Sequence, residues 1–152
     1  MNNDFHIWEN NRNIYLKFLI HNSLEELNKV PKGFNNNLLW NIGHVIAVQQ
    51  RLVYGLAHVP LKISDDLFQK YKPGTKPEIP EPEETVELFK ELLIKTIAET
   101  KADFGSGKLD HYTPYTTSKG FHLSSAAEAI TFNNYHEALH LGTMVSLLKF
   151  IK

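Results

Sequence analysis

The chain has 152 residues, and we expect residues 1–152 to form a single domain with a substantial hydrophobic core. Hydrophobic residues make up 42% of it and charged residues 22%, a composition that is typical of globular proteins and argues against a disordered chain. The formal net charge of -1 gives no reason to expect nucleic acid or an anionic membrane as a partner. The chain has no cysteine, which excludes disulfides, thiolate metal sites and a cysteine nucleophile.

The cytoplasm is the compartment that the sequence favours. The N-terminus begins Met1-Asn2-Asn3-Asp4, without the basic and apolar regions of a signal peptide. No apolar run approaches the roughly 20 residues that a membrane span needs. The absence of cysteine also fits a reducing compartment. We therefore expect a cytoplasmic protein that does not cross a membrane.

Helical periodicity dominates the first third of the chain. Between Phe5 and Ile20 the apolar residues recur near a period of 3.6, which predicts an amphipathic helix. The sequence that starts at Ser23 and reads SLEE is a capping box, so a short second helix should begin there. Asparagines at 35–37 can cap a longer helix that runs to about Gly55. Apolar residues cover more than half of that helix, which indicates a buried position inside a bundle.

Residues 57–82 form the longest stretch without a regular pattern. Ser64 can cap one short helical piece that runs to Gln69, and four prolines between positions 73 and 82 break any regular structure beyond it. A loop of this length is unusual inside a compact domain. It is either a crossover between helices that are not antiparallel neighbours or a lid over a site, and the sequence leaves both interpretations open.

A third main helix comes after this loop. Pro82 stands at a first-turn position, the next two residues are acidic, and the apolar pattern then continues to about Ala102. Residues 108–122 are rich in turn-forming residues, with tyrosines and threonines that weakly indicate a short hairpin.

The last helix is predicted to begin at Ser124 or Ser125 and to continue to about Phe150. Ser125 and Glu128 have the spacing of a second capping box. Four main helices without a convincing sheet predict an all-α fold, a four-helix bundle in which residues 57–82 form a long crossover between main helices two and three.

Three of the eight histidines are candidate metal ligands. His136 and His140 lie four residues apart in the last helix, so their rings project from one face. His44 lies on an apolar face of the helix that precedes the long loop. Ligands on facing helices meet in the core of a bundle, and three neutral imidazoles with an open position are typical of a catalytic metal site. Hydrogen-bonded structural histidines are the alternative, and for the other five we expect solvated or capping roles.

The sequence from His136 to His140 also matches the H-E-x-x-H pattern of zinc proteases. That class needs a further ligand downstream, and no Asp, Glu or His follows His140. No strand pattern is present that could hold a peptide substrate. We therefore do not favour a protease. The catalytic group stays unassigned: Glu137 is a candidate, and a partly exposed carboxylate without a role is the alternative.

Two segments resemble the DinB/YfiT-like superfamily. Leu39–Val45 resembles its W-x-x-G-H segment, and His136–Met144 resembles its H-x-x-x-H-x-G helix. The order of helices and loops is also similar over nearly the whole chain. The resemblance implies a four-helix bundle with a long connection between main helices two and three. It further implies a homodimer and a divalent metal ion, most often nickel or zinc, held by His44, His136 and His140.

Characterised members of that superfamily include metal-dependent transferases and isomerases that use small cytosolic thiols. The leading hypothesis is accordingly a metal-dependent transferase or hydrolase, in which the ion activates a small thiol or water against a small-molecule substrate. Because the chain has no cysteine, the thiol would be a cosubstrate. A non-catalytic metal-binding or stress-associated binding module is the alternative. Candidates for the wall of a substrate pocket are Tyr15, Trp40, Arg51 and Asn133.

Overall fold

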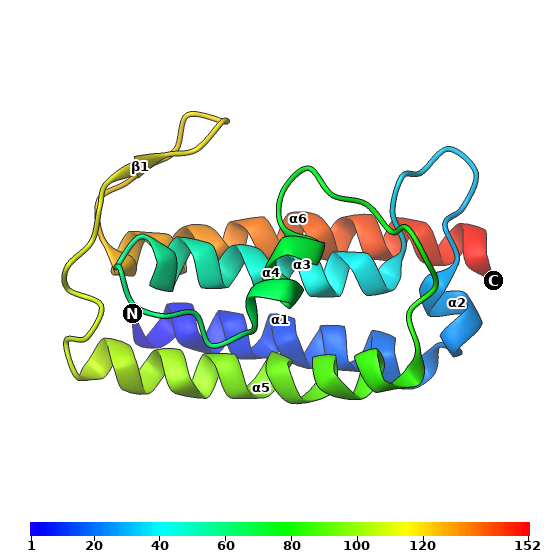
Figure 1. Ribbon diagram of the computed structural model, residues 1–152, viewed down its shortest axis with the longest axis horizontal. Coiled ribbons are helices and arrows are strands. Elements are labelled where there is room, and N and C mark those ends of the chain that lie inside the picture. The colour runs from blue at the N-terminus through cyan, green and yellow to red at the C-terminus, as the bar shows by residue number, and fades with distance from the viewer.

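Four long helices run along the longest axis of the computed structural model, which describes all 152 residues (Figure 1). They are α1 (Asn2–His21), α3 (Leu38–Gln50), α5 (Glu83–Gly105) and α6 (Ala126–Ile151). Helices α1 and α3 each pack against both α5 and α6. The predicted all-α four-helix bundle is confirmed. None of the helices combines the length and the apolarity that crossing a bilayer requires.

The helix starts in the first half of the chain agree with the predicted caps. The short helix α2 (Leu24–Asn28) begins after Ser23, whose hydroxyl accepts a hydrogen bond from the Glu26 backbone while the Glu26 carboxylate accepts one from the Ser23 backbone. The side chain of Asn37 accepts from the backbone N–H of Trp40 at the start of α3. These caps satisfy N–H groups that would otherwise have no partner in the first turn.

The cap of α6 differs from the predicted capping box. Ser125 is the N-cap, and its hydroxyl accepts from the Glu128 backbone. The Glu128 carboxylate, however, accepts from both the backbone and the hydroxyl of Ser124, so the second half of the box at Ser125 is not formed. Two neighbouring serines compete for one carboxylate, and the sequence alone could not decide between them.

Helix α3 continues into a π-helical turn, η1 (Arg51–Gly55). The predicted end near Gly55 is confirmed, but the winding changes after Gln50. The backbone N–H of Leu56 donates to the Arg51 carbonyl, five residues earlier. A wider turn shifts the direction of the side chains beyond it, which a periodicity of 3.6 cannot show.

The connection between α3 and α5 carries one short helix, α4 (Asp65–Tyr71), which begins after Ser64 as predicted and extends two residues past Gln69. Figure 1 shows α4 lying across the long helices, and it packs against α3. The connection is therefore a crossover whose helix also covers part of α3. A two-stranded antiparallel hairpin, β1 (Tyr115–Thr116) with β2 (His122–Leu123), precedes α6 and confirms the weak strand signal there.

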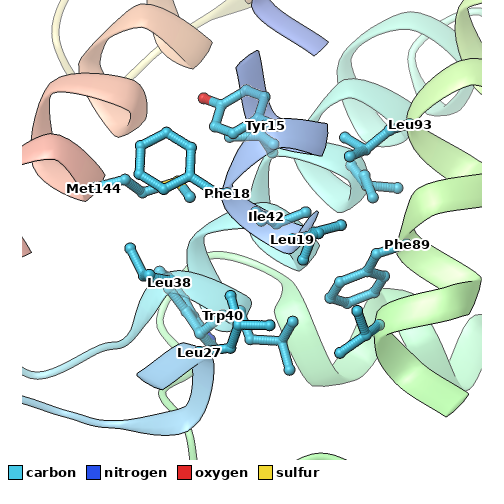
Figure 2. Close-up of a cluster of buried hydrophobic side chains, with 14 of the residues drawn as sticks. Tyr15, Phe18, Leu19, Leu27, Leu38, Trp40, Ile42, Phe89, Leu93 and Met144 are labelled. Atoms are coloured by element: carbon cyan, nitrogen blue, oxygen red, sulfur yellow. The ribbon is translucent and has the colours of Figure 1, made fainter. Parts of the chain in front are cut away.

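Helix α3 lies at the centre of the bundle, because every one of its residues is buried. One cluster joins side chains from all four long helices, including Phe18, Ile42, Phe89 and Met144 (Figure 2). A second cluster includes Trp8, Val53, Ile97 and Ile130. His44 thus lies on a helix surrounded by apolar side chains, where a polar ring requires partners.

Candidate metal centre

Three imidazoles meet where α3 packs against α6. The ring centroid of His44 lies 5.4 Å from that of His136 and 4.8 Å from that of His140, and the two rings of α6 are 4.6 Å apart. One potential ligand atom from each residue lies within 4.8 Å of the others. The helical spacing of His136 and His140 puts both rings on one face of α6, and helix packing brings His44 opposite them. This grouping allows one divalent ion to contact all three rings.

Hydrogen bonds orient two of the three rings. His44 Nδ1–H donates to the carbonyl oxygen of Tyr71, at 2.8 Å, because a carbonyl only accepts. His140 Nδ1–H donates to Asn41 Oδ1 at 2.8 Å. The Asn41 amide is itself fixed, since its Nδ2 donates to the Asn37 carbonyl at 2.7 Å. Protons held on Nδ1 leave the Nε2 lone pairs of His44 and His140 free, the arrangement found in most metal-bound histidines.

All three imidazoles favour the neutral form. Burial lowers the pKa of His136 to about 3, and repulsion between its protonated form and protonated His140, protonated His44 and Arg12 adds to this shift. Burial lowers the pKa of His140 to about 4, and repulsion between the protonated forms of His140 and His44 adds to this shift. Burial also lowers the pKa of His44, while the Tyr71 carbonyl partly opposes that shift. Neutral imidazole is the form that binds a metal ion.

His136 supplies an independent sign that the site is built for a ligand. Its Nδ1 is buried and has no hydrogen-bond partner. A buried polar atom without a partner ordinarily costs about 1–3 kcal/mol. Three neutral nitrogen donors without a carboxylate form a set that suits zinc, nickel, copper or iron better than magnesium or calcium. The residues present therefore fit the divalent ion that the sequence implied.

Trp40 contacts the site directly. Its ring stacks on His44, with centroids 4.6 Å apart and planes 15° from parallel. Its Nε1–H donates to the hydroxyl of Thr75 in the crossover. Trp40 and Tyr71 also line a cavity of about 360 Å³, whose other walls come largely from the crossover. Trp40 therefore contacts both this cavity and the first candidate ligand, and its role in the wall of a substrate pocket stays a prediction.

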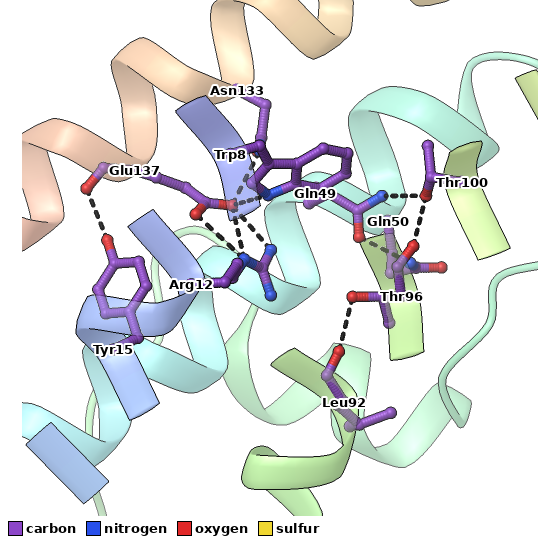
Figure 3. A network of polar contacts seen from close by, with 10 residues as sticks. All are labelled: Trp8, Arg12, Tyr15, Gln49, Gln50, Leu92, Thr96, Thr100, Asn133 and Glu137. Atoms are coloured by element: carbon purple, nitrogen blue, oxygen red, sulfur yellow. Dashed lines mark hydrogen bonds and ion pairs between the residues drawn. The ribbon is translucent and has the colours of Figure 1, made fainter. Parts of the chain in front are cut away.

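Glu137 lies in a buried polar network between α6 and α1 (Figure 3). Its carboxylate forms an ion pair with Arg12 at 2.7 Å, and both side chains are 0% exposed. It also accepts from Trp8 Nε1 and from Asn133 Nδ2, each at 2.8 Å. The alternative of a partly exposed carboxylate is wrong, because α1 packs over this side of α6 and buries Glu137. We assign Glu137 to holding these two helices together and do not propose it as a general base.

The other three pocket candidates lie in different surroundings. Tyr15 is fully buried, and its hydroxyl donates to the Glu137 carbonyl at 2.6 Å. Asn133 belongs to the same network. Arg51 lies in η1 with its guanidinium 5.3 Å from the centre of the Tyr115 ring, beside the hairpin. Tyr15 and Asn133 thus support the turn of α6 that carries His136, and contact with a substrate stays a prediction for all three.

Two groups that hold the ligands were not predicted from the sequence. Asn41 carried a usable signal, because it is a lone amide in an otherwise apolar stretch of a buried helix. Tyr71 acts through its backbone carbonyl, so its side chain gave no indication of this contact. The five remaining histidines are exposed, which agrees with the solvated roles expected for them: His6, His21, His58, His111 and His122.

The chain is similar in sequence to a known protein family. The sequence model of the DinB superfamily matches residues 7–144, which include both motif segments and all three clustered histidines. A search of curated proteins found no match. The match covers most of the chain and confirms the resemblance that Leu39–Val45 and His136–Met144 indicated. The chain therefore belongs to the DinB superfamily.

Proposed function

We propose that this protein is a metal-dependent enzyme in which His44, His136 and His140 hold one divalent ion, with nickel and zinc as the expected metals. The observation that carries the proposal is the cluster of three neutral imidazoles, which contains no fourth histidine, aspartate or glutamate. Three protein ligands leave at least one coordination position for an exogenous group. A site of this kind is open to water, to a small thiol and to a substrate.

The chemistry that such an ion supplies is a lowered pKa for a bound water or thiol, which makes a nucleophile available near neutral pH. The chain's own residues prepare the site. The Tyr71 carbonyl and Asn41 fix the rings of His44 and His140. Trp40 covers one face of the His44 ring, which limits the access of bulk water from that side. We propose thiol S-transfer or hydrolysis of a small molecule as the reaction, with any thiol entering as a cosubstrate.

A non-catalytic metal-binding module is the second candidate, including a stress-associated binding role. Its support is the burial of His44 and the contact that the crossover makes with this ring, which resemble the closed surroundings of a structural ion. The two candidates differ in what chelation does. A structural ion holds the fold together, whereas a catalytic ion can be removed from a protein that stays folded.

Elemental analysis of the purified protein and an assay of thiol consumption with a reactive electrophile test the enzymatic proposal together. We expect about one divalent ion per chain and thiol consumption that His140→Ala abolishes. His21→Ala removes an exposed histidine at the end of α1 and is the matched control, expected to behave as wild type. Equal rates in the wild type and His140→Ala would exclude thiol transfer by this site.

We also propose a homodimer and a cytoplasmic location. The homodimer is supported by large apolar side chains that α6 leaves exposed, among them Tyr135, Leu139 and Phe150. Exposed apolar surface of this kind is typical of contact surfaces between proteins. The lack of cysteine supports a reducing compartment.

A further inference from the structure

Gly43 lies directly before the candidate ligand His44, in the middle of α3, and the aromatic ring of Tyr71 lies against it. A Cβ atom at position 43 would be 2.5 Å from Tyr71 Cδ1 and 2.7 Å from Cγ and Cε1. Carbon atoms that are not bonded do not approach so closely, so no residue other than glycine fits beside this ring. Glycine is also among the poorest helix formers in a helix interior. Its presence here therefore indicates that the close approach of Tyr71 is needed.

The ring of Tyr71 is anchored on more than one side. It is almost fully buried, and its centre lies 5.3 Å from that of Phe89 on α5 in an edge-to-face arrangement. Gly43 on α3 gives it the space to lie flat against that helix. The last residue of α4 is thus fixed between two of the long helices.

The position of this ring decides where the backbone of Tyr71 lies. The Tyr71 carbonyl accepts the hydrogen bond from His44 Nδ1–H at 2.8 Å. A side chain on residue 43 would push the ring, and with it the carbonyl, away from His44. The imidazole would then lose the acceptor that fixes its tautomer and its orientation toward the other two rings.

We propose that Gly43 and Tyr71 form a seat that positions His44 for metal binding through the crossover. The Tyr71 carbonyl orients the first ligand, and Gly43 is a positioning residue because it admits the ring that holds this carbonyl in place. The inference rests on the proposed metal site, and it assigns the crossover a part in that site. A glycine that served only to pack the core would affect stability without changing the ion affinity of the folded protein.

Gly43→Ala tests the seat, and Gly142→Ala is its matched control. Gly142 also lies inside a long helix, two residues after the candidate ligand His140, but a Cβ there meets nothing within 4 Å. We expect Gly43→Ala to weaken nickel or zinc binding by about 10- to 100-fold, the range for loss of a contact that orients a ligand. Gly142→Ala should bind as wild type. Competition with a chromophoric chelator measures the affinity, and circular dichroism verifies that each variant is folded.

Substitutions of Tyr71 test the other side of the seat. Tyr71→Phe keeps the ring and the carbonyl and should bind the ion as wild type. Tyr71→Ala removes the ring and should bind more weakly, and Gly43→Ala should have little further effect in that background, because the two changes break one contact. If Gly43→Ala fails to fold, the comparison of Tyr71→Phe with Tyr71→Ala still tests whether ion binding needs the ring of Tyr71. Wild-type affinity in folded Gly43→Ala or in Tyr71→Ala would overturn the proposal.

A measurement on the metal-free protein separates this inference from the proposed function. Nitrogen chemical shifts of the His44 ring report whether Nδ1 carries the proton. We expect a protonated Nδ1 in the wild type and in Gly142→Ala, and a mixture of tautomers in Gly43→Ala. If this pattern of tautomers is found but the wild type binds no ion, the orientation of His44 by Gly43 and Tyr71 is supported and the proposed metal site is excluded. If Gly43→Ala keeps the wild-type tautomer, the positioning role of the seat is excluded, whether or not the protein binds an ion.

Discussion

At the scale of single residues, the three clustered histidines link the stability of the metal-free protein to pH. In an unfolded chain a histidine takes up a proton near pH 6.5. In the folded protein the pKa of His136 lies at about 3 and that of His140 at about 4. Between pH 6.5 and the lowered pKa values of the folded protein, the unfolded state therefore binds more protons than the folded state. The stability that the neutral rings contribute above pH 6.5 is lost as the pH falls.

We expect the melting temperature of the metal-free protein to be nearly constant above pH 6.5 and to fall between pH 6.5 and pH 5. In this window most carboxylates are still ionised, so the histidines dominate the change. His136→Gln should show a shallower slope, because it removes the ring whose pKa is lowered most. Thermal unfolding at a series of pH values checks this, with His21→Ala as the control. A wild-type melting temperature that does not change over this window would contradict the burial of neutral rings.

Among the single residues of the site, some could be predicted from the sequence and others could not. His136 and His140 were identifiable because their spacing is local to one helix. His44 was identifiable because a polar ring in an apolar helix needs a partner. The contact between His44 and the Tyr71 carbonyl joins residues 27 positions apart and uses only the backbone of Tyr71. No sequence pattern contains that information, because every residue has a carbonyl.

At the scale of helices, the buried ion pair between Arg12 and Glu137 joins α1 to α6. Figure 3 shows the Arg12 guanidinium and the Glu137 carboxylate facing each other, with Trp8 and Asn133 also directed at the carboxylate. A buried carboxylate that loses its cationic partner is left uncompensated in a region of low polarity. The pair therefore fixes how α6 lies on α1, one residue away from His136.

We expect Arg12→Met to lower the free energy of unfolding by about 3–5 kcal/mol, the range for breaking a buried pair on one side. Lys95→Met breaks the exposed pair with Glu91, whose side chains are 52% and 60% exposed, and should cost only about 0–1 kcal/mol. Adding Glu137→Leu to Arg12→Met should recover part of the loss, because it removes the unpaired charge. Urea unfolding followed by circular dichroism measures all three. Equal losses in Arg12→Met and Lys95→Met would contradict this role.

Helix boundaries were predictable where a cap lies within a few residues of the helix it starts. Ser23, Asn37 and Ser64 each cap the helix that they were predicted to start. The burial of Glu137 was not predictable, because it depends on α1 packing over that side of α6. The placement of α4 over α3 was open for the same reason: both depend on contacts between distant segments.

At the scale of the whole molecule, the apolar core is built from side chains of all four long helices. Two clusters of buried side chains extend along the bundle and contain contributions from every long helix. An ion bound by the three histidines would add a link between α3 and α6, but the hydrophobic faces are covered by packing of the helices themselves. Burial of apolar surface is the main contribution to the stability of a domain of this size.

We therefore expect the protein to stay helical after chelation and to gain stability when the ion is restored. At a free ion concentration of 100 times the dissociation constant, the gain should be about 2.7 kcal/mol. Thermal unfolding at increasing nickel or zinc concentrations measures the gain, and circular dichroism measures the helix content of the chelated protein. The variant His140→Ala is the control and should gain little. Loss of helix on chelation would favour the structural role for the ion.

The exposed face of α6 leads to a prediction about assembly. Phe132, Tyr135, Leu139 and Phe150 recur at spacings that place them on one side of this helix, and the last three are exposed. Phe121 of the hairpin packs against Phe132 and Tyr135 and extends this apolar surface. A second copy of the chain would bury the same face on both subunits, as two-fold symmetry requires.

Leu139→Lys should therefore give a particle with the mass of one chain, whereas the wild type should have twice that mass. Ile94→Lys is the matched control: Leu139 is 53% exposed and Ile94 is 50% exposed, both lie in long helices, and the change is the same, but Ile94 is on α5. Lysine in the middle of an apolar contact would have to lose its hydration without a partner. Light scattering at several protein concentrations gives the masses. A wild type with the mass of one chain at every concentration, or equal masses for the two variants, would rule out a dimer through α6.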